Sequence, residues 1–559
     1  MKPWRVLIAL LAAGLLLDVF LHLSVAAAPP DLEPGGLIVP LGPTQTDLRA
    51  AYAEPLRHVY RGGRVQWLAH TAPLTPTRLQ PGDLYLPPGE VDADFCSTCA
   101  TLALTGTVEI SRAYALAPGR IALFRSSVTY PIPPAGEAVV MWEYALFRQL
   151  FDGYLRGAAP YTTLDEAGLA AGLEGYDLLI LPAFNREQTG AVLEALGDAG
   201  LSAIAAFVND GGTLYAQGAG LLIAQAAGVL PPDTVDPVAV IELVPEDAVG
   251  NIGRLEILRP ESPLAWSWHT ETLYVLDDPV LTADAPVEVV AVFTNTLGGT
   301  SPAVIHTHWG AGRVIGVAGH PTDPTRRNQL PLFMDALLLS LSRYVEFGGD
   351  AIQTFNPDYP PHEFPAYEAV PVSATLRIVN LWDEAMQTAV VTERLSPGYA
   401  LTGTIVPQPA DLYTETDGAT VLTWELGNLA PRASITLTFQ AITSPTVLAA
   451  GVSTFSQGKL TYSDPEGRLR VTQHRPFILH SQMAARLVGD RDVEGDRYYR
   501  LPAEGLYLDM ALPLENKEHT AAPRVTAQDW VVLISPIVDI ANQHVILSAN
   551  DGETIWPLC

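Results

Sequence analysis

The chain has 559 residues and a formal net charge of −29, with 61 acidic against 32 basic residues. A chain of this length is too long to fold around a single hydrophobic core, so about three or four domains are expected. So acidic a protein repels phosphate backbones, which excludes nucleic acid as an expected partner. Only three cysteines are present, so disulfide bonds cannot be the main source of stability.

The first 28 residues have the order of a secretory signal peptide. Lys2 and Arg5 precede an apolar run, and small residues follow it up to Ala28. Cleavage would fit after Ala27, and an uncleaved membrane anchor is the alternative, since the apolar stretch approaches the ~20 residues of a spanning helix. The sequence therefore predicts an extracellular or cell-surface protein that meets a membrane only if this N-terminal segment is not cleaved.

Residues 36–345 alternate short apolar runs with amphipathic stretches. This alternation predicts an α/β domain with a doubly wound, mainly parallel sheet. The clearest unit is an apolar strand at 176–182, a helix over 188–208 and a strand at 213–216. Other strands are expected at 37–40, 64–68 and 121–124, and other helices at 46–61 and 137–155.

The sequence pattern changes at about residue 346. Residues 346–365 are rich in proline and glycine, which predicts a stiff linker. Residues 366–480 lose the helical periodicity and alternate polar with apolar residues between turn signals, which predicts an all-β sandwich. Residues 481–559 are expected to form a second β-rich module, and the alternative is that this module is cut short at Cys559.

Residues 176–228 resemble the class I glutamine amidotransferase superfamily. In that family a strand turns sharply into a helix, and a catalytic Cys stands on the turn. Here the turn reads Ala-Gln-Gly-Ala-Gly, and Gly218 stands in the place of the Cys. Residues 310–321 resemble the closing strand of the same family and its His-Pro-Glu signature, with His320 as the general base and Thr322 in place of the orienting Glu.

The resemblance implies a flavodoxin-like, amidotransferase-like domain with a degenerate site, in which Gly218 and His320 are candidate ligand-binding residues. A glycine has no side chain that can attack a carbonyl, so covalent acyl transfer of the family's kind is excluded. No catalytic residue is therefore expected, and the sequence predicts a pseudoenzyme domain.

Residues 366–472 resemble the immunoglobulin-like repeat modules of bacterial surface and cell-wall proteins. The resemblance is carried by residues 376–380, the turn at 395–398 and residues 423–431, which include Trp424. In those modules the Trp fills the core between two sheets and none of these residues is catalytic. The resemblance implies spacer or adhesive units.

These observations together predict an exported, non-catalytic binding or structural protein of the cell surface. Its partner would be an unknown extracellular ligand or a cell-envelope component. One alternative is a secreted or envelope hydrolase with a water nucleophile and His320 as base. Another is an envelope protein that senses a small metabolite.

Cys96 and Cys99 form a CxxC pair. In an oxidising compartment a local disulfide is expected, and redox chemistry or a zinc site are the alternatives. His306 and His308 are two residues apart, which places both on one face of a strand and could suit a metal. Since no third ligand is spaced with them, a structural polar pair is expected.

Asp490, Asp492 and Glu494 have the spacing of the first half of a calcium loop. Leu501 stands where such a loop needs its bidentate Glu, which excludes the helix-loop-helix version. A solvated, charged turn is the competing interpretation. Calcium is the only cofactor that the sequence suggests.

Overall fold

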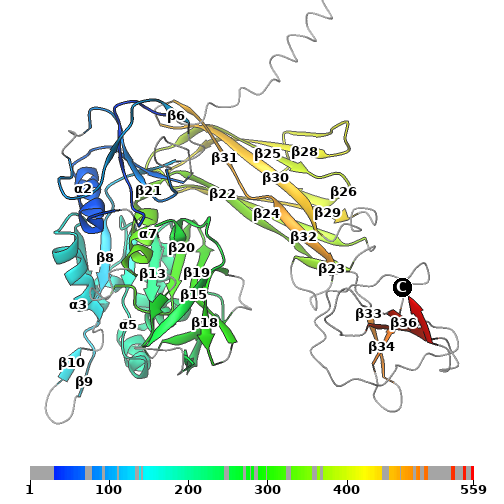
Figure 1. Ribbon diagram of the computed structural model, residues 1–559, viewed down its shortest axis with the longest axis horizontal. Coiled ribbons are helices and arrows are strands. Elements are labelled where there is room, and N and C mark those ends of the chain that lie inside the picture. The colour runs from blue at the N-terminus through cyan, green and yellow to red at the C-terminus, as the bar shows by residue number, and fades with distance from the viewer. Residues whose placement is uncertain are drawn as a thin grey trace, which may run out of the picture.

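The computed structural model describes residues 31–482 and five short strands beyond them. Within 31–482 it leaves out residues 44, 70–78, 91–94, 110–112, 132–136, 140–142, 245–250, 268–271, 277, 283–286, 298, 323–328, 356–361, 366–368, 444–451 and 466. Two large hydrophobic cores organise this part of the chain, one within residues 37–381 and one within residues 345–479. Figure 1 shows the blue-to-green first part and the elongated yellow-to-orange second part that extends from it.

Nine strands form the central sheet of the first part, in the order β11-β8-β12-β13-β20-β19-β18-β15-β16. The first five run parallel to one another, and each of the last four runs antiparallel to its neighbours. Their bounds are Tyr161–Leu164, Ile121–Phe124, Leu178–Leu181, Thr213–Gln217, Gly312–Val317, Gly299–Trp309, Glu288–Thr296, Ile252–Ile257 and Thr272–Tyr274.

A second, six-stranded sheet lies in the same part, and every pairing in it is antiparallel. In the order β21-β7-β3-β4-β2-β5, its strands are Ser342–Arg343, Ala113–Leu116, Val65–Leu68, Leu84–Leu86, Leu37–Val39 and Leu102–Ala103. Three strand pairs stand beside the two sheets: β1 (Asp31–Leu32) with β6 (Val108–Glu109), β9 (Thr129–Pro131) with β10 (Glu137–Val139), and β14 (Val235–Val240) with β17 (Pro279–Leu281).

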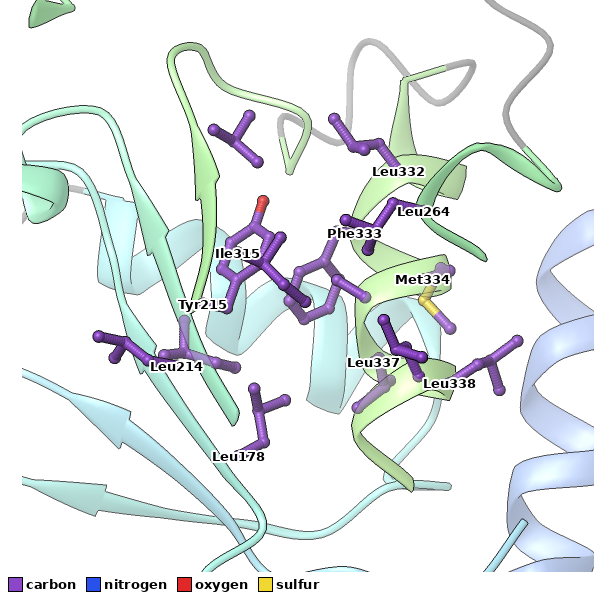
Figure 2. Packing of buried hydrophobic residues seen from close by; sticks show 14 of the residues in the cluster. Leu178, Leu214, Tyr215, Leu264, Ile315, Leu332, Phe333, Met334, Leu337 and Leu338 are labelled. Atoms are coloured by element: carbon purple, nitrogen blue, oxygen red, sulfur yellow. The ribbon is translucent and has the colours of Figure 1, made fainter. Parts of the chain in front are cut away.

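The helices of the first part are few and mostly short. They are α2 (Leu48–Tyr60), α3 (Glu143–Arg148), the π-helix η1 (Gln149–Tyr154), α4 (Glu166–Ala170), the 3-10 turns η2 (Arg186–Gln188) and η3 (Pro263–Ala265), α5 (Thr189–Asn209), α6 (Gly220–Ala226) and α7 (Leu330–Leu341). Every residue of α7 is buried, because an apolar surface all round a helix needs cover on every side. Figure 2 shows Phe333 of this helix beside Tyr215 and Ile315 of the central sheet, and its ring lies 5.1 Å from the Tyr215 ring.

The predicted doubly wound, mainly parallel α/β fold is wrong. In the part of the chain that the structure describes, strand outweighs helix, 44% against 20%, the central sheet is mixed, and the second sheet is antiparallel throughout. Residues 37–39, 48–60 and 65–68 have the periodicity of a strand-helix-strand unit, but β4 inserts between β2 and β3. The alternation of helix and strand does not reveal such an insertion, since β4 comes later in the chain. The single helix expected over 137–155 is replaced by β10, α3 and η1.

One helical stretch of the described chain, Arg186–Asn209, has the length and composition of a helix that crosses a membrane. In this structure its second part, α5, packs on the sheet and buries Val192, Leu196 and Ile204. The N-terminal segment 1–28 lies outside the described residues, so the predicted signal peptide stays a prediction.

A β-sandwich occupies residues 345–482. One sheet has the order β22-β24-β29-β26, with strands Val345–Gln353, Pro371–Asn380, Ser434–Thr443 and Tyr399–Val406. The other has the order β23-β32-β30-β25-β28-β27, with β31 also paired to β30. Its strands are Glu363–Pro365, Phe477–Gln482, Val452–Ser463, Met386–Leu395, Thr420–Leu429, Asp411–Thr414 and, for β31, Leu469–Gln473. Trp424 is buried between the sheets, and its Nε1 donates to the Pro407 carbonyl at 2.8 Å.

Within the segment predicted as a linker, 346–365, the described residues 346–353 and 363–365 are strand. Residues 345–353 form β22, an edge strand of the sandwich. The Gly348-Gly349 pair suggested a break, but a Cβ atom at Gly349 would lie 2.1 Å from the Thr375 carbonyl oxygen of β24. Glycine is needed there for close approach of two strands. Beyond 482 the described strands are β33 (Arg486–Arg491), β34 (Arg497–Arg500), β35 (Val531–Ile534), β36 (Val545–Ser548) and β37 (Ile555–Leu558).

Candidate active site

Gly218 and His320 lie side by side at the C-terminal ends of two neighbouring parallel strands. Gly218 follows β13 and precedes α6, and His320 comes three residues after β20. The backbone of Gly218 has a φ of +51°, a conformation that glycine adopts without steric cost. A Cβ atom at Gly218 would lie 3.6 Å from His320 Cε1. The two candidate ligand-binding residues therefore belong to one site.

Two carboxylates hold the imidazole of His320 from opposite edges. Its Nδ1 lies 2.5 Å from Glu143 Oε1, and its Nε2 lies 3.1 Å from Asp278 Oδ2. The exposed fractions of the three side chains are 2% or less. Burial alone would lower the pKa of His320, but the charges of Asp278 and Glu143 raise it well above its ordinary value. The two carboxylates therefore favour the protonated form of the ring, an imidazolium.

A second set of hydrogen bonds fixes Glu143. Its Oε2 accepts from the Gln217 side-chain amide and from the Ala183 backbone N–H at 3.3 Å. Gln217 in turn accepts from the Tyr215 hydroxyl at 3.0 Å and donates to Thr322 Oγ1 at 3.3 Å. Because these partners are buried and connected, the carboxylate has one position and can fix the orientation of the imidazole.

Asp278 occupies the space above the strand-to-helix turn. A Cβ atom at Gly218 would lie 2.6 Å from Asp278 Oδ1 and 2.8 Å from Ala183 Cβ. The other oxygen, Oδ2, accepts from the Leu276 backbone N–H at 2.9 Å, and the Asp278 carbonyl accepts from the Ile241 N–H. The turn has no room for a nucleophilic side chain, and a carboxylate oxygen stands in the place that the amidotransferase resemblance assigns to one.

Sequence reasoning missed both carboxylates. Glu143 is 177 residues from His320 in the chain and begins a short helix, and Asp278 lies between two short strands. Neither belongs to a motif. The expectation that His320 lacks an orienting carboxylate, because Thr322 replaces the family's Glu, is wrong: Glu143 supplies it from another element.

The other predicted residues lie elsewhere. Cys96 and Cys99 are joined by a disulfide bond with an S–S distance of 2.06 Å. His306 Nδ1 lies 3.3 Å from Glu288 Oε2 and His308 Nε2 lies 2.5 Å from Glu346 Oε1. Burial lowers the pKa of His308 to about 4.

The proposed calcium ligands are not placed by the structure. Asp492 and Glu494 lie outside the described residues, as does the side chain of Asp490 in β33. In the described part of the chain, no group of three or more His, Cys, Asp or Glu side chains is arranged to hold a metal ion. The calcium interpretation therefore stays a prediction.

No protein-family model and no curated protein matches the chain. Among solved structures, a β-galactosidase from Rahnella sp. R3 is similar at 14% identity and a TM-score of 0.26, over 57% of this chain and 40% of the enzyme. A β-galactosidase from Bacillus circulans gives 13% and 0.25, over 58% of this chain and 42% of the enzyme. The exo-β-1,4-mannosidase Op5Man5 from Opitutaceae bacterium strain TAV5 gives 12% and 0.25, over 40% and 36%. The chain thus spans about two fifths of the length of these β-galactosidases and 36% of the length of the mannosidase.

The prediction of a non-catalytic binding or structural protein with a pseudoenzyme domain is wrong. It assumed that the turn at Gly218 carries no reactive group and that nothing orients His320. The site instead brings an imidazole and two carboxylates into direct contact, which are the side chains that general acid–base chemistry uses.

Proposed function

We propose that the first part of the chain is a hydrolase in which Asp278 activates a water molecule and His320 protonates the leaving group. The observation that supports it best is the position of Asp278 Oδ1 above Gly218, with an imidazolium between this carboxylate and Glu143. The nucleophile remains water, as in the hydrolase alternative. The base is Asp278, because a protonated His320 has no free lone pair that can accept a proton.

Each side chain has one role in the reaction. Asp278 Oδ1 takes a proton from the water, whose oxygen forms a bond to the electrophilic carbon of the substrate. The bond to the leaving group breaks, and the leaving group receives the proton from His320 Nε2. The proton on Asp278 then passes to His320, which restores the starting state. Glu143 keeps the ring in place through its contact with Nδ1.

The charge of the site favours a substrate whose reacting group is neutral. Glu143, Asp278 and His320 together carry a net charge of about −1 when the ring is protonated. The whole chain carries −29, so phosphate esters and other anions are repelled. The substrate class proposed here is a neutral ester, amide or glycoside.

Turnover of a chromogenic panel tests this function. p-Nitrophenyl esters, anilides and glycosides are offered to the wild type, to Asp278→Asn and to the matched control Asp198→Asn, an exposed carboxylate on α5. We expect wild-type turnover of a neutral class, a loss of at least about 100-fold in Asp278→Asn, and no change in the control. Equal rates in the wild type and Asp278→Asn, or no wild-type turnover of any neutral class, would refute the proposal.

The substitution Gly218→Cys should not create a glutaminase. The new side chain meets Asp278 Oδ1 and Ala183 Cβ at contact distances that force a shift, and the φ of +51° strains any residue with a Cβ. We expect no ammonia release from glutamine above the wild-type background and a lowered thermal midpoint. Robust glutaminase activity in this variant would show that the turn accepts a nucleophile and that Asp278 does not occupy its place.

We also propose that the hydrolase acts outside the cytoplasm. The order of charges, apolar residues and small residues in the first 28 positions supports export, and the Cys96–Cys99 disulfide is typical of an oxidising compartment.

A further inference from the structure

The chain passes from the first part into the sandwich without a linker. Helix α7 ends at Leu341, β21 takes the next two residues, and β22 begins at Val345. The only residue between the two strands is Tyr344. Its ring stacks on Tyr114 with 4.1 Å between the centroids, and its carbonyl accepts from the Leu381 N–H at 3.0 Å. Flexible linkers lack such contacts.

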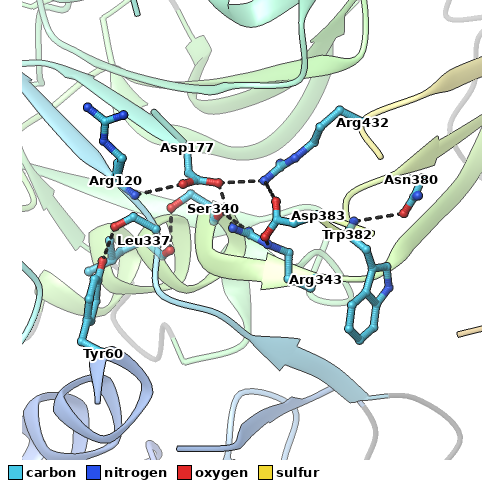
Figure 3. Close-up of polar contacts among 11 residues, drawn as sticks. Tyr60, Arg120, Asp177, Leu337, Ser340, Arg343, Asn380, Trp382, Asp383 and Arg432 are labelled. Carbon is cyan, nitrogen blue, oxygen red and sulfur yellow. Dashed lines mark hydrogen bonds and ion pairs between the residues drawn. The ribbon is translucent and has the colours of Figure 1, made fainter. Parts of the chain in front are cut away.

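Four charged side chains form an alternating network across this junction (Figure 3). Asp177, next to β12, accepts from Arg343 and from Arg432 at 2.8 Å each. Asp383 of the sandwich accepts from the same two arginines at 3.0 and 2.7 Å. Arg343 is 4% exposed. Each charge therefore has two partners of opposite sign. Arg343 and Asp177 are the least exposed members of the network, whereas Asp383 is 61% exposed.

A second network joins β20 to β22. Glu346 of β22 lies 3.3 Å from Arg313 Nη2 and 2.5 Å from His308 Nε2, and Arg313 also donates to the Tyr344 hydroxyl at 3.0 Å. Burial would raise the pKa of Glu346, but His308 and Arg313 lower it well below its ordinary value. Arg377 of β24 donates to the Gly310 carbonyl just before β20.

Apolar packing and one further ion pair complete the junction. Val379 and Leu381, from the end of β24, are buried within the core of the first part and not within that of the sandwich. Arg475, which follows β31, lies 2.6 Å from Glu261. Contacts thus reach the first part from four separate places in the sandwich sequence: Glu346, residues 377–383, Arg432 and Arg475.

We infer that the sandwich is docked on the first part as a fixed, obligate partner, and that the two unfold as one cooperative unit. The surface at Asp177, Gly310 and Arg313 is the docking site, and its occupant is the β22–β24 side of the sandwich of the same chain. A spacer would join through a mobile linker and few contacts. Here removal of either domain separates Glu346 from Arg313 and His308 and breaks the Arg432–Asp177 and Arg343–Asp383 contacts, which leaves the buried side chain of Arg313 without a carboxylate.

Differential scanning calorimetry of the whole chain tests this inference. We expect a single transition in the wild type, whose calorimetric and van't Hoff enthalpies agree. Arg343→Gln combined with Arg432→Gln should separate it into two transitions, the first of them several degrees lower. Arg394→Gln is the matched control, because Arg394 pairs with Glu415 and Asp417 inside the sandwich. It should keep a single transition.

Two separate transitions in the wild type would overturn the inference, as would a double variant that unfolds like the control. If the double variant does not fold, Arg432→Gln alone, at a side chain 27% exposed, gives the same comparison. If the calorimetric and van't Hoff enthalpies of that variant no longer agree, the result supports the docked unit. If both their ratio and the midpoint temperature are unchanged, the result contradicts it. The experiment measures no turnover, so its result is independent of the proposed hydrolase function.

Discussion

Replacing Glu143 by glutamine should lower the free energy of unfolding by about 3 kcal/mol, because breaking a buried ion pair leaves its partner poorly compensated. Glu143 is fully buried and contacts His320 at 2.5 Å. A glutamine would also present an amide to Gln217, which now donates to the carboxylate. Urea unfolding at pH 7, followed by circular dichroism, measures the change. The matched control is Glu194→Gln, an exposed residue of α5, which should change stability by no more than about 0.5 kcal/mol.

The difference in unfolding free energy between the wild type and Glu143→Gln should also change with pH in one direction. The folded-state pKa of His320 lies well above its unfolded value, so the stability from this site is fully present below about pH 6.5. It is lost as the pH rises through the raised folded-state value. The difference between wild type and Glu143→Gln should therefore shrink in the alkaline range. A difference that grows with pH, or one as small as in the control, would contradict an imidazolium at this position.

Replacing Asp335 by asparagine should stabilise the protein at alkaline pH. Asp335 lies inside the core on α7, and burial raises its pKa to about 8, although the Ser267 hydroxyl and backbone N–H lower it in part. Below the unfolded pKa of 3.8 both states hold the proton. Between there and about pH 8 the folded state holds it more tightly, so wild-type stability falls by up to about 1.4 kcal/mol per pH unit.

Unfolding free energies measured from pH 5 to pH 9 check this expectation. Asparagine does not ionise, so the unfolding free energy of Asp335→Asn should lack the fall with pH that Asp335 causes in the wild type. The difference between the variant and the wild type should therefore grow in favour of the variant as the pH rises. Two curves that stay parallel over the whole range would show that Asp335 does not take up a proton on folding.

The sequence predicted the part of the site that local signals encode. The apolar run that forms β12 and the glycine-rich turn at Gly218 are patterns within a few residues, and so is the strand that ends before His320. Parallel neighbours bring the carboxyl ends of their strands to one edge, which is why Gly218 and His320 lie together.

The remaining features depend on contacts between distant residues. Glu143 and Asp278 reach the site only after α3 and the β16–β17 connection have packed, and no spacing in the sequence marks either one. Sequence reasoning missed the antiparallel half of the central sheet. Polar and apolar residues alternate along β18 and β19 as in any half-buried strand, and this alternation does not show whether the neighbouring strands are parallel or antiparallel. Gly349 suggested a break between two domains, but in the structure it lies within β22 and permits close approach of β24.

The protonation state of His320 decides most directly whether this site works as proposed. In protein labelled with 15N-histidine, the proton-coupled spectrum of the wild type at pH 7.5 should contain one residue with both ring nitrogens protonated and slowly exchanging. That pair of signals should be absent from His320→Gln and present in Asp198→Asn. A neutral His320, with one protonated nitrogen at that pH, would contradict the imidazolium between Glu143 and Asp278 and remove the proton that the leaving group is proposed to receive.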